Sequence, residues 1–320
     1  MRYITIPQTD LQVSALCLGS TMIGSDLDEA ASFEVMDAFA DAGGNFLDTA
    51  RVYADWLPGG HGASEKTIGA WLTQRKNRDH MVIGTKGAHP DLKTMHISRM
   101  SEREIAADID ESLRCLRTDR IDLYWLHRDD EKIPVEAILD IMEKFVRRGK
   151  IRYYGCSNWK TPRIRAAWEH ARAAGVKGFL ADQPQWSLAD LNPGAYEDQT
   201  LVNMGPELYE LHRQTGLAAL PYTSQAKGFF SKFAENPAQL DGKAKARFWN
   251  EKNIARARLA QEFAHALKVP VAAIPLAWLI HQPFTTIPII GSRNVDQLQE
   301  SLTAADLLLE RDMVKKLTNP

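Results

Sequence analysis

The sequence predicts an α/β protein with the (β/α)8, or TIM, barrel fold, and three observations support this. Short runs rich in apolar residues recur eight times along the 320 residues. Longer segments with apolar residues at three- and four-residue spacing separate them, as amphipathic helices would. The chain is also long enough for the roughly 250 residues of such a barrel plus insertions. A strand followed by a helix, repeated eight times, predicts one parallel barrel.

The predicted strands are apolar on consecutive residues, as strands buried on both faces should be. In chain order they cover residues 15–19, 45–49, 81–85, 121–127, 151–157, 179–183, 218–222 and 286–290. The clearest amphipathic segments predict helices over residues 28–42, 101–117, 135–148, 161–174 and 254–267. Ser101 and Glu104 have the spacing of a capping box, and Pro162 stands at a first helical position. Both observations agree with the helix starts predicted from the apolar spacing.

Two segments lie outside the repeat. Residues 2–13 predict a β-hairpin before the first barrel strand, and residues 225–252 form a long, polar loop after strand seven. Because barrel active sites lie at the C-terminal ends of the strands, this long loop is on the expected catalytic face. No linker-like segment divides the chain, so we expect one domain over residues 1–320.

Composition and charge argue against several classes of protein. The 39 Lys and Arg nearly balance the 41 Asp and Glu without any run of five like charges, which disfavours nucleic-acid or membrane-surface binding. Cys17, Cys115 and Cys156 have no C-x-x-C spacing, so we predict neither a disulfide framework nor a metal site. With no signal segment or membrane-length apolar run, we expect a cytoplasmic monomer or weak homo-oligomer that acts on a small molecule.

Four polar residues stand at or just after predicted strand ends. Asp48 lies at the end of strand two with Tyr53 five residues later, Lys86 follows strand three, and His127 ends strand four. A lysine cation beside a phenol stabilises the phenolate, an aspartate keeps the lysine charged, and a histidine can orient a carbonyl or share a proton. The set predicts an acid that protonates an oxygen, and a reduction would require a cofactor to give the hydride.

The order of these residues resembles the signature of the aldo-keto reductase family. Residues 48–53 read D-T-A-R-V-Y, residues 64–69 read S-E-K-T-I-G, Thr85 and Lys86 form a T-K pair, and residues 122–127 read D-L-Y-W-L-H. The resemblance extends over nearly the whole chain. It implies a catalytic tetrad in which Tyr53 is the general acid, Asp48 and Lys86 tune it, and His127 orients the carbonyl.

The resemblance also implies a nicotinamide cofactor, and no G-x-G-x-x-G motif of a Rossmann domain follows a predicted strand. Around the nicotinamide it places Gly19, Ser20, Thr21, Asp48, Ser157, Asn158, Gln183 and Tyr222, the last stacking on the ring. Along the pyrophosphate it places Thr223, Gln225, Lys227 and Gly228, and around the adenosine Gly291, Ser292, Arg293, Gln297, Glu300 and Ser301. Ser292 and Arg293 could bind a 2′-phosphate, which favours NADPH, with NADH as the alternative.

The predicted activity is the reversible reduction of an aldehyde or ketone to an alcohol. For the substrate we predict pocket walls at Met22, Trp56, Arg128 and Trp159, in an open pocket because the chain after Glu310 is short. One alternative is a nucleotide-sensing regulatory subunit of the same fold with little turnover. Another is a barrel isomerase or lyase that uses Lys86 as a Schiff base, which Asp48 disfavours by keeping the lysine charged.

Overall fold

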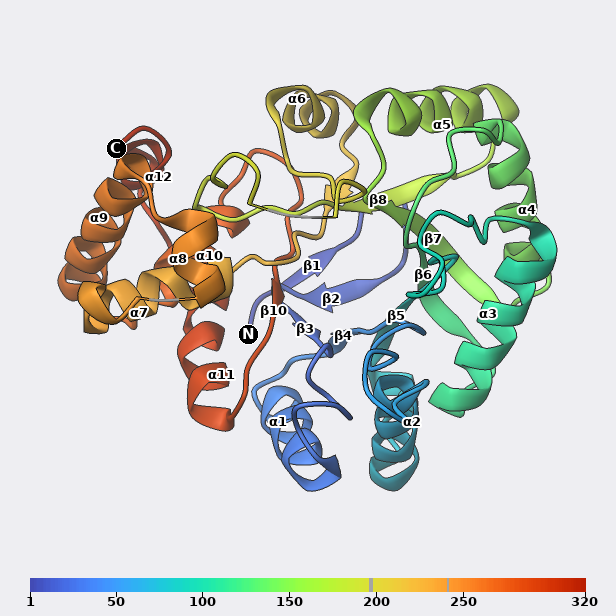
Figure 1. Ribbon diagram of the computed structural model, residues 1–320, viewed down its shortest axis with the longest axis horizontal. Helices are drawn as coiled ribbons and strands as arrows, with labels where there is room; N and C mark the ends of the chain where they lie inside the picture. Colours follow the sequence, from blue (N-terminus) through green and yellow to red (C-terminus); the bar gives the residue numbers. More distant parts are fainter. Residues whose placement is uncertain (196–197, 241) are drawn as a thin grey trace.

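The computed structural model describes residues 1–195, 198–240 and 242–320. Eight parallel strands form one sheet in the order β10-β3-β4-β5-β6-β7-β8-β9, with helices around it (Figure 1). The strands are β3 (Cys17–Gly19), β4 (Phe46–Asp48), β5 (Val82–Gly87), β6 (Ile121–Leu126), β7 (Ile151–Ser157), β8 (Phe179–Gln183), β9 (Ala218–Ala219) and β10 (Ile289–Ile290). The predicted α/β barrel fold is confirmed.

The sheet closes between its first and last strands. On one side of β10, Ile289 pairs with Cys17 of β3. On the other side, Ala219 of β9 forms a parallel bridge with Thr286, and the Ile287 N–H donates to the Ala219 carbonyl over 2.9 Å. The last two strands are shorter than the predicted 218–222 and 286–290, since Pro221 and Pro288 have no N–H to add to a ladder.

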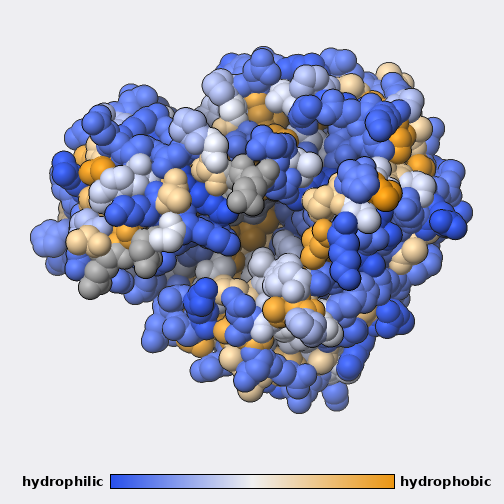
Figure 2. Space-filling view, viewed as in Figure 1, coloured by the Kyte–Doolittle hydropathy of each residue, from blue (hydrophilic) through white to orange (hydrophobic). Residues whose placement is uncertain are grey.

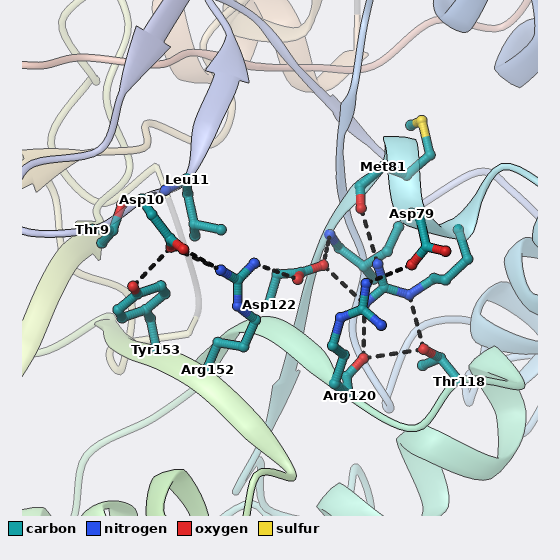
Figure 3. A network of polar contacts seen from close by, with 12 residues as sticks. Thr9, Asp10, Leu11, Asp79, Met81, Thr118, Arg120, Asp122, Arg152 and Tyr153 are labelled. Carbon is teal, nitrogen blue, oxygen red and sulfur yellow. Dashed lines mark hydrogen bonds and ion pairs between the residues drawn. The ribbon is translucent and has the colours of Figure 1, made fainter.

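The predicted hairpin covers the N-terminal end of the barrel. It consists of β1 (Tyr3–Thr5) and β2 (Gln12–Ser14), which pair antiparallel, and its apolar side chains are buried with residues of the barrel interior, including Trp125. Arg152 Nη2 donates to both carboxyl oxygens of Asp10 over 2.7 and 2.8 Å, and the Tyr153 hydroxyl donates to Asp10 over 2.8 Å (Figure 3). The hairpin therefore leaves only the C-terminal end of the barrel for a site.

Four of the predicted helices begin within one residue of their predicted starts, whereas the helix predicted from residue 254 begins at Glu251, because the Asn250 side chain accepts from the Asn253 N–H and caps the helix there. Ser101 and Glu104 form the capping box of α3, and Pro162 lies in the first turn of α5. No helix among the described residues is long and apolar enough to cross a membrane. The helices are α1 (Glu29–Asp41), α2 (Ala63–Arg75), α3 (Glu102–Leu116), α4 (Val135–Arg147), α5 (Thr161–Ala174), α6 (Pro206–Thr215), α7 (Phe229–Glu235), α8 (Gly242–Phe248), α9 (Glu251–Leu267), α10 (Ala273–Ile280), α11 (Val295–Leu302) and α12 (Arg311–Thr318).

The long connection after β9 is more ordered than its polar composition indicates. It contains a 3-10 turn, η2 (Ala226–Gly228), then α7, a second turn η3 (Pro237–Gln239), and α8, and it runs into α9. Phe229, Phe230 and Phe248 are buried in one apolar cluster with residues of α9. Buried aromatic side chains thus anchor the connection, whose helices gather at the left of Figure 1.

Candidate active site

A cavity of about 950 Å³ opens at the C-terminal ends of the strands. Its walls include the last residues of β3, β4, β7 and β8, which are Gly19, Asp48, Ser157 and Gln183. Figure 2 shows the molecular surface hollowed near the centre of the face where Figure 1 shows the ring of strands. The volume lies at the upper end of the roughly 300–1,000 Å³ typical of small-molecule sites.

The four strand-end residues singled out in the sequence all line this cavity. Lys86 of β5 is the centre of the group: its ammonium donates to Asp48 Oδ2, to the Thr49 carbonyl over 2.7 Å and to the Tyr53 hydroxyl oxygen over 3.1 Å. An ammonium has three hydrogens to donate, so these contacts use all of them and fix its direction. The Tyr53 ring lies 6.2 Å from the imidazole of His127, centre to centre.

Because Lys86 and Asp48 are buried, the pKa of each depends strongly on the charge of the other. Burial, the largest single effect, lowers the pKa of Lys86, but the charges and hydrogen bonds of Asp48 and Tyr53 together raise it more, and the net pKa lies above the ordinary 10.5. Burial also raises the pKa of Asp48 above its ordinary 3.8, against the opposing effects of Lys86 and Gln183. Lys86 therefore carries a positive charge beside the Tyr53 phenol at neutral pH.

His127 is buried and electrically neutral. Burial, and then His89, Arg128 and Lys86, hold the pKa of His127 well below its ordinary 6.5. Its Nδ1 has no hydrogen-bond partner among the described residues. A bare nitrogen lone pair costs less there than an unpaired N–H, so we place the proton on Nε2, which makes Nε2 a hydrogen-bond donor.

Four residues predicted to hold the nicotinamide lie together on one wall. Ser157, Asn158, Gln183 and Tyr222 line the cavity. Asn158 Oδ1 is already engaged, because it accepts from the Tyr222 hydroxyl over 2.6 Å and from the Val202 N–H over 3.1 Å. Gln183 Oε1, in contrast, is buried and has no partner within the described part of the chain. It is therefore a free acceptor on this wall.

The residues predicted around the pyrophosphate and adenosine form the far end of the cavity. Gln225 joins two loops there: its Nε2 donates to Ser301 Oγ and its Oε1 accepts from the Gly291 N–H, both over 2.9 Å. Gln297 Oε1 accepts from the Arg293 N–H over 3.1 Å. The residues of this group that line the cavity are Thr223, Gln225, Lys227, Gly228, Gly291, Arg293, Gln297, Glu300 and Ser301.

Three of the predicted site residues lie outside the cavity wall. Ser20 is buried, and its hydroxyl accepts from the Ser64 hydroxyl over 2.9 Å, whereas its neighbours Gly19 and Thr21 line the cavity. Ser292 is also buried, with a hydroxyl that has no described partner. Trp159 points into the protein: its ring packs 4.9 Å from Phe179 and its indole N–H donates to the Arg128 carbonyl over 3.2 Å.

The other predicted substrate contacts, Met22, Trp56 and Arg128, do line the cavity. Trp56 is 48% exposed with its ring 6.5 Å from that of Tyr53, so an apolar surface stands directly beside the phenol. Arg128 is held in place, since Nη1 donates to the His127 carbonyl and Nε to Thr200 Oγ1, both over 2.8 Å.

The connection after β9 contributes a group of cations that was not predicted from the sequence. Lys232 of α7 and Lys243 and Arg247 of α8 line the cavity together with Lys227 and Arg293. Burial, and then Arg247, Lys243 and Arg293, lower the pKa of Lys227 below its ordinary 10.5. Three basic residues within residues 242–248 were the available signal in the sequence, but only the folded connection brings two of them, Lys243 and Arg247, to the cavity. The positive charges gathered at this end favour the binding of an anion.

An α/β barrel with a lysine, a carboxylate, a phenol and an imidazole at the floor of its cavity has the parts of a nucleotide-dependent oxidoreductase, and comparison with known proteins supports this. The model of the aldo/keto reductase family matches residues 15–319. The chain therefore belongs to the aldo/keto reductase family and is an NAD(P)H-dependent oxidoreductase.

Three relatives align over almost the whole chain. The uncharacterized oxidoreductase YrpG of Bacillus subtilis is 29% identical, with 100% of this chain and 95% of the relative covered. The NADP(+) aryl-alcohol dehydrogenase of Phanerodontia chrysosporium is 28% identical, covering 98% and 84%. The norsolorinic acid reductase stcV of Emericella nidulans is also 28% identical, covering 97% and 79%.

The cavity fits a nicotinamide dinucleotide at both ends. The unpaired Gln183 Oε1 can accept a hydrogen bond from a carboxamide NH2, and that end adjoins Lys86 and Tyr53. The opposite end presents cations suited to phosphates.

Proposed function

We propose that this protein is an NADPH-dependent reductase that converts an aldehyde or ketone to an alcohol, reversibly, with Asp48, Tyr53, Lys86 and His127 as its catalytic residues. The observation that carries the proposal is the buried Lys86 ammonium, which contacts Asp48 on one side and the Tyr53 hydroxyl, 3.1 Å away, on the other. In this proposal residues 1–320 act as one barrel domain.

The chain's own residues supply the proton and the orientation. Tyr53 gives its proton to the carbonyl oxygen, and the Lys86 cation stabilises the negative charge left on the phenol oxygen. His127, neutral and protonated on Nε2, donates a hydrogen bond to the same carbonyl oxygen and orients it. The bound nicotinamide supplies the hydride that the carbonyl carbon receives, which no side chain can provide.

The preference for NADPH rests on the charges at the far end of the cavity. Arg293, Lys243 and Arg247 line that end, and a 2′-phosphate adds up to two negative charges that NADH lacks. One relative, the aryl-alcohol dehydrogenase of Phanerodontia chrysosporium, is named as an NADP(+) enzyme. We therefore assign recognition of the 2′-phosphate to this cluster, with Arg293 as its principal residue.

For the substrate we propose an aromatic aldehyde or ketone. The exposed indole of Trp56 beside Tyr53 offers a flat apolar face for an aromatic ring. The name of the same relative indicates an aryl alcohol as a substrate of that protein. Aliphatic carbonyl compounds would lack the stacking contact and should bind more weakly.

The experiment combines binding and turnover. Titration of the purified protein with NADPH and NADH, followed by tryptophan fluorescence, should show saturable binding that is tighter for NADPH. A panel of aryl and aliphatic aldehydes and ketones, monitored through NADPH oxidation at 340 nm, should then give turnover that is fastest for aryl aldehydes. Absence of nucleotide binding would contradict the proposed cofactor site, and binding without turnover of any carbonyl would favour the regulatory alternative.

A further inference from the structure

A second histidine, His89, lies in the loop after β5, beside the end of β6. The chain reaches it through Ala88, whose φ of +57° lies in the left-handed region that is costly for a residue with a side chain. Asp108 Oδ2 holds this kink by accepting from the Ala88 N–H over 2.8 Å. Strain of this kind persists only where surrounding contacts enforce it, and here it turns His89 inwards until it is 6% exposed.

The inward turn brings His89 against His127. The two ring centres are 4.7 Å apart and the ring planes meet at 61°, an edge-to-face arrangement. His89 is itself held, because its Nδ1 lies 2.6 Å from the Pro90 carbonyl oxygen. A carbonyl oxygen only accepts, so Nδ1 carries the proton and the orientation of the His89 ring is fixed.

Among the residues that the structure describes, none forms an equivalent hydrogen bond with Nδ1 of His127. Its main chain is well anchored: its N–H donates to the Gly87 carbonyl over 2.9 Å, and its carbonyl oxygen accepts from Arg128 Nη1 over 2.8 Å. Its ring nitrogen Nδ1, however, has no partner in the described residues. Active-site histidines usually owe their ring orientation to a hydrogen bond at the second nitrogen. The ring contacts that remain here are with Tyr53 and His89, and His89 is the nearer.

We propose that His89 is a positioning residue that holds the imidazole of His127 in the orientation from which Nε2 faces the cavity. The inference deepens the proposed function, because it assumes that the carbonyl oxygen is bound by His127. His89 acts through its ring, which fills the space on one side of His127 and excludes water from Nδ1.

The electrostatic surroundings agree with two neutral rings in contact. Burial and then Arg128 lower the pKa of His89 to about 4, with Arg51 adding to the effect and Asp198 opposing it. Burial, and then His89, Arg128 and Lys86, all disfavour protonation of His127 and hold its pKa well below the ordinary 6.5. Neither imidazole therefore gains a proton between pH 6 and pH 8, and no charge repulsion separates the rings.

Two substitutions distinguish the effect of the His89 ring from the effect of its hydrogen bond. His89→Asn keeps a donor near the position of Nδ1 but removes the ring, and His89→Phe keeps a ring of similar size but removes the donor. His96→Asn is the matched control, since His96 is an exposed histidine in the same loop. Each variant is assayed for NADPH affinity, kcat, KM and thermal unfolding, and His127 is followed by 15N-edited NMR of the histidine side chains, assigned with a His127→Asn variant.

The proposal predicts that His89→Asn lowers kcat by about tenfold or more while NADPH affinity stays within about twofold, and that His89→Phe restores most of kcat. In the wild type, His127 should appear as one neutral Nε2–H form that does not titrate above pH 5. In His89→Asn, water reaches Nδ1, so the His127 signals should broaden and the pKa of His127 should rise towards 6.5.

Three results would overturn the inference. One is an unchanged His127 spectrum and kcat in His89→Asn. Another is a joint loss of kcat, NADPH affinity and thermal stability, which would assign His89 to the structure of the loop instead. The third is an effect of His96→Asn equal to that of His89→Asn. If no carbonyl compound is turned over, the proposed function fails, but the NMR comparison still decides whether His89 orients His127.

Discussion

Gln183 Nε2 donates a hydrogen bond to Asp48 Oδ1 over 2.8 Å, which joins the end of β8 to the end of β4 across the mouth of the barrel. Because a carboxylate can only accept, the amide NH2 of Gln183 must face Asp48. Its Oε1 therefore faces away, and it is buried with no partner in the described residues. One side chain thus supports Asp48 and, in the proposed function, presents an acceptor for the nicotinamide carboxamide.

Gln183→Glu should make cofactor binding and stability depend on pH. Two buried carboxylates would then face each other, and they cannot both ionise without repulsion. Below the raised pKa of the new carboxyl group, its O–H can still donate to Asp48. The variant should bind NADPH and resist thermal unfolding better at pH 5.5 than at pH 8. Gln183→Leu, which cannot titrate, should weaken NADPH binding about equally at both pH values, and the same pH response in both variants would refute the assignment.

Asp48→Asn should destabilise the protein and impair catalysis. The substitution leaves the Lys86 ammonium, which is 3% exposed, without its charge partner. Breaking a buried ion pair in this way typically costs about 3–5 kcal/mol. We expect the free energy of unfolding, measured with urea, to fall by this amount, and kcat to be at least about 100-fold lower. The double variant Asp48→Asn, Lys86→Met should recover part of the stability but none of the activity. A double variant less stable than Asp48→Asn would contradict the view that the unpaired Lys86 charge causes the loss of stability.

Removal of cavity cations should weaken NADPH binding more than NADH binding. Arg293→Ala and Lys243→Ala should each raise the Kd for NADPH about tenfold, equivalent to roughly 1.4 kcal/mol, and change that for NADH less than about threefold. Lys245→Ala is the control, because Lys245 lies on the same helix over the Trp249 ring and outside the cavity. Isothermal titration calorimetry at two salt concentrations provides the measurement, and equal losses for both nucleotides would place the 2′-phosphate elsewhere.

Glu65 should make the folded state less stable as the pH rises. It is completely buried, and burial raises its pKa from 4.5 to about 7, against the hydrogen bond from Thr85 Oγ1. The folded protein thus binds this proton more tightly than the unfolded chain does, so stability is full below pH 4.5, falls through the interval up to 7, and stays low above it. The difference corresponds to about 3 kcal/mol.

Glu65→Gln removes this titration and isolates its effect. The variant keeps a side-chain oxygen for Thr85 but has no proton to lose, so the gap between variant and wild type should open in favour of the variant between pH 5 and pH 8. Urea unfolding at several pH values measures that gap. A gap that is constant with pH would show that Glu65 has an ordinary pKa.

The sequence predicted the barrel and the tetrad residues because both follow from local rules. The apolar runs indicate where each strand ends, and in a parallel barrel the C-terminal ends of all strands lie on the same face. Asp48, Lys86 and His127 could therefore be placed together from the sequence alone. The aldo/keto reductase motifs then added the residues of the cofactor wall, and the structure places most of them around one cavity.

Other features depended on contacts between distant segments. Trp159 stands two residues beyond Ser157, but its ring packs against Phe179 and not against the cavity. Lys243 and Arg247 reach the cavity only because buried phenylalanines fold the connection after β9. His89 reaches His127 through a left-handed Ala88, a conformation that the sequence does not signal. In each case tertiary packing decides which way a side chain points.

The proton donor is the central claim, and Tyr53→Phe tests it most directly. The substitution removes one oxygen, the acceptor of the Lys86 hydrogen bond over 3.1 Å, and keeps the ring beside Trp56 and His127. Single-turnover reduction of an aryl aldehyde by the NADPH-bound protein should slow by about 100-fold or more, with NADPH affinity within about twofold of wild type. A single-turnover rate close to that of the wild type would show that another group gives the proton.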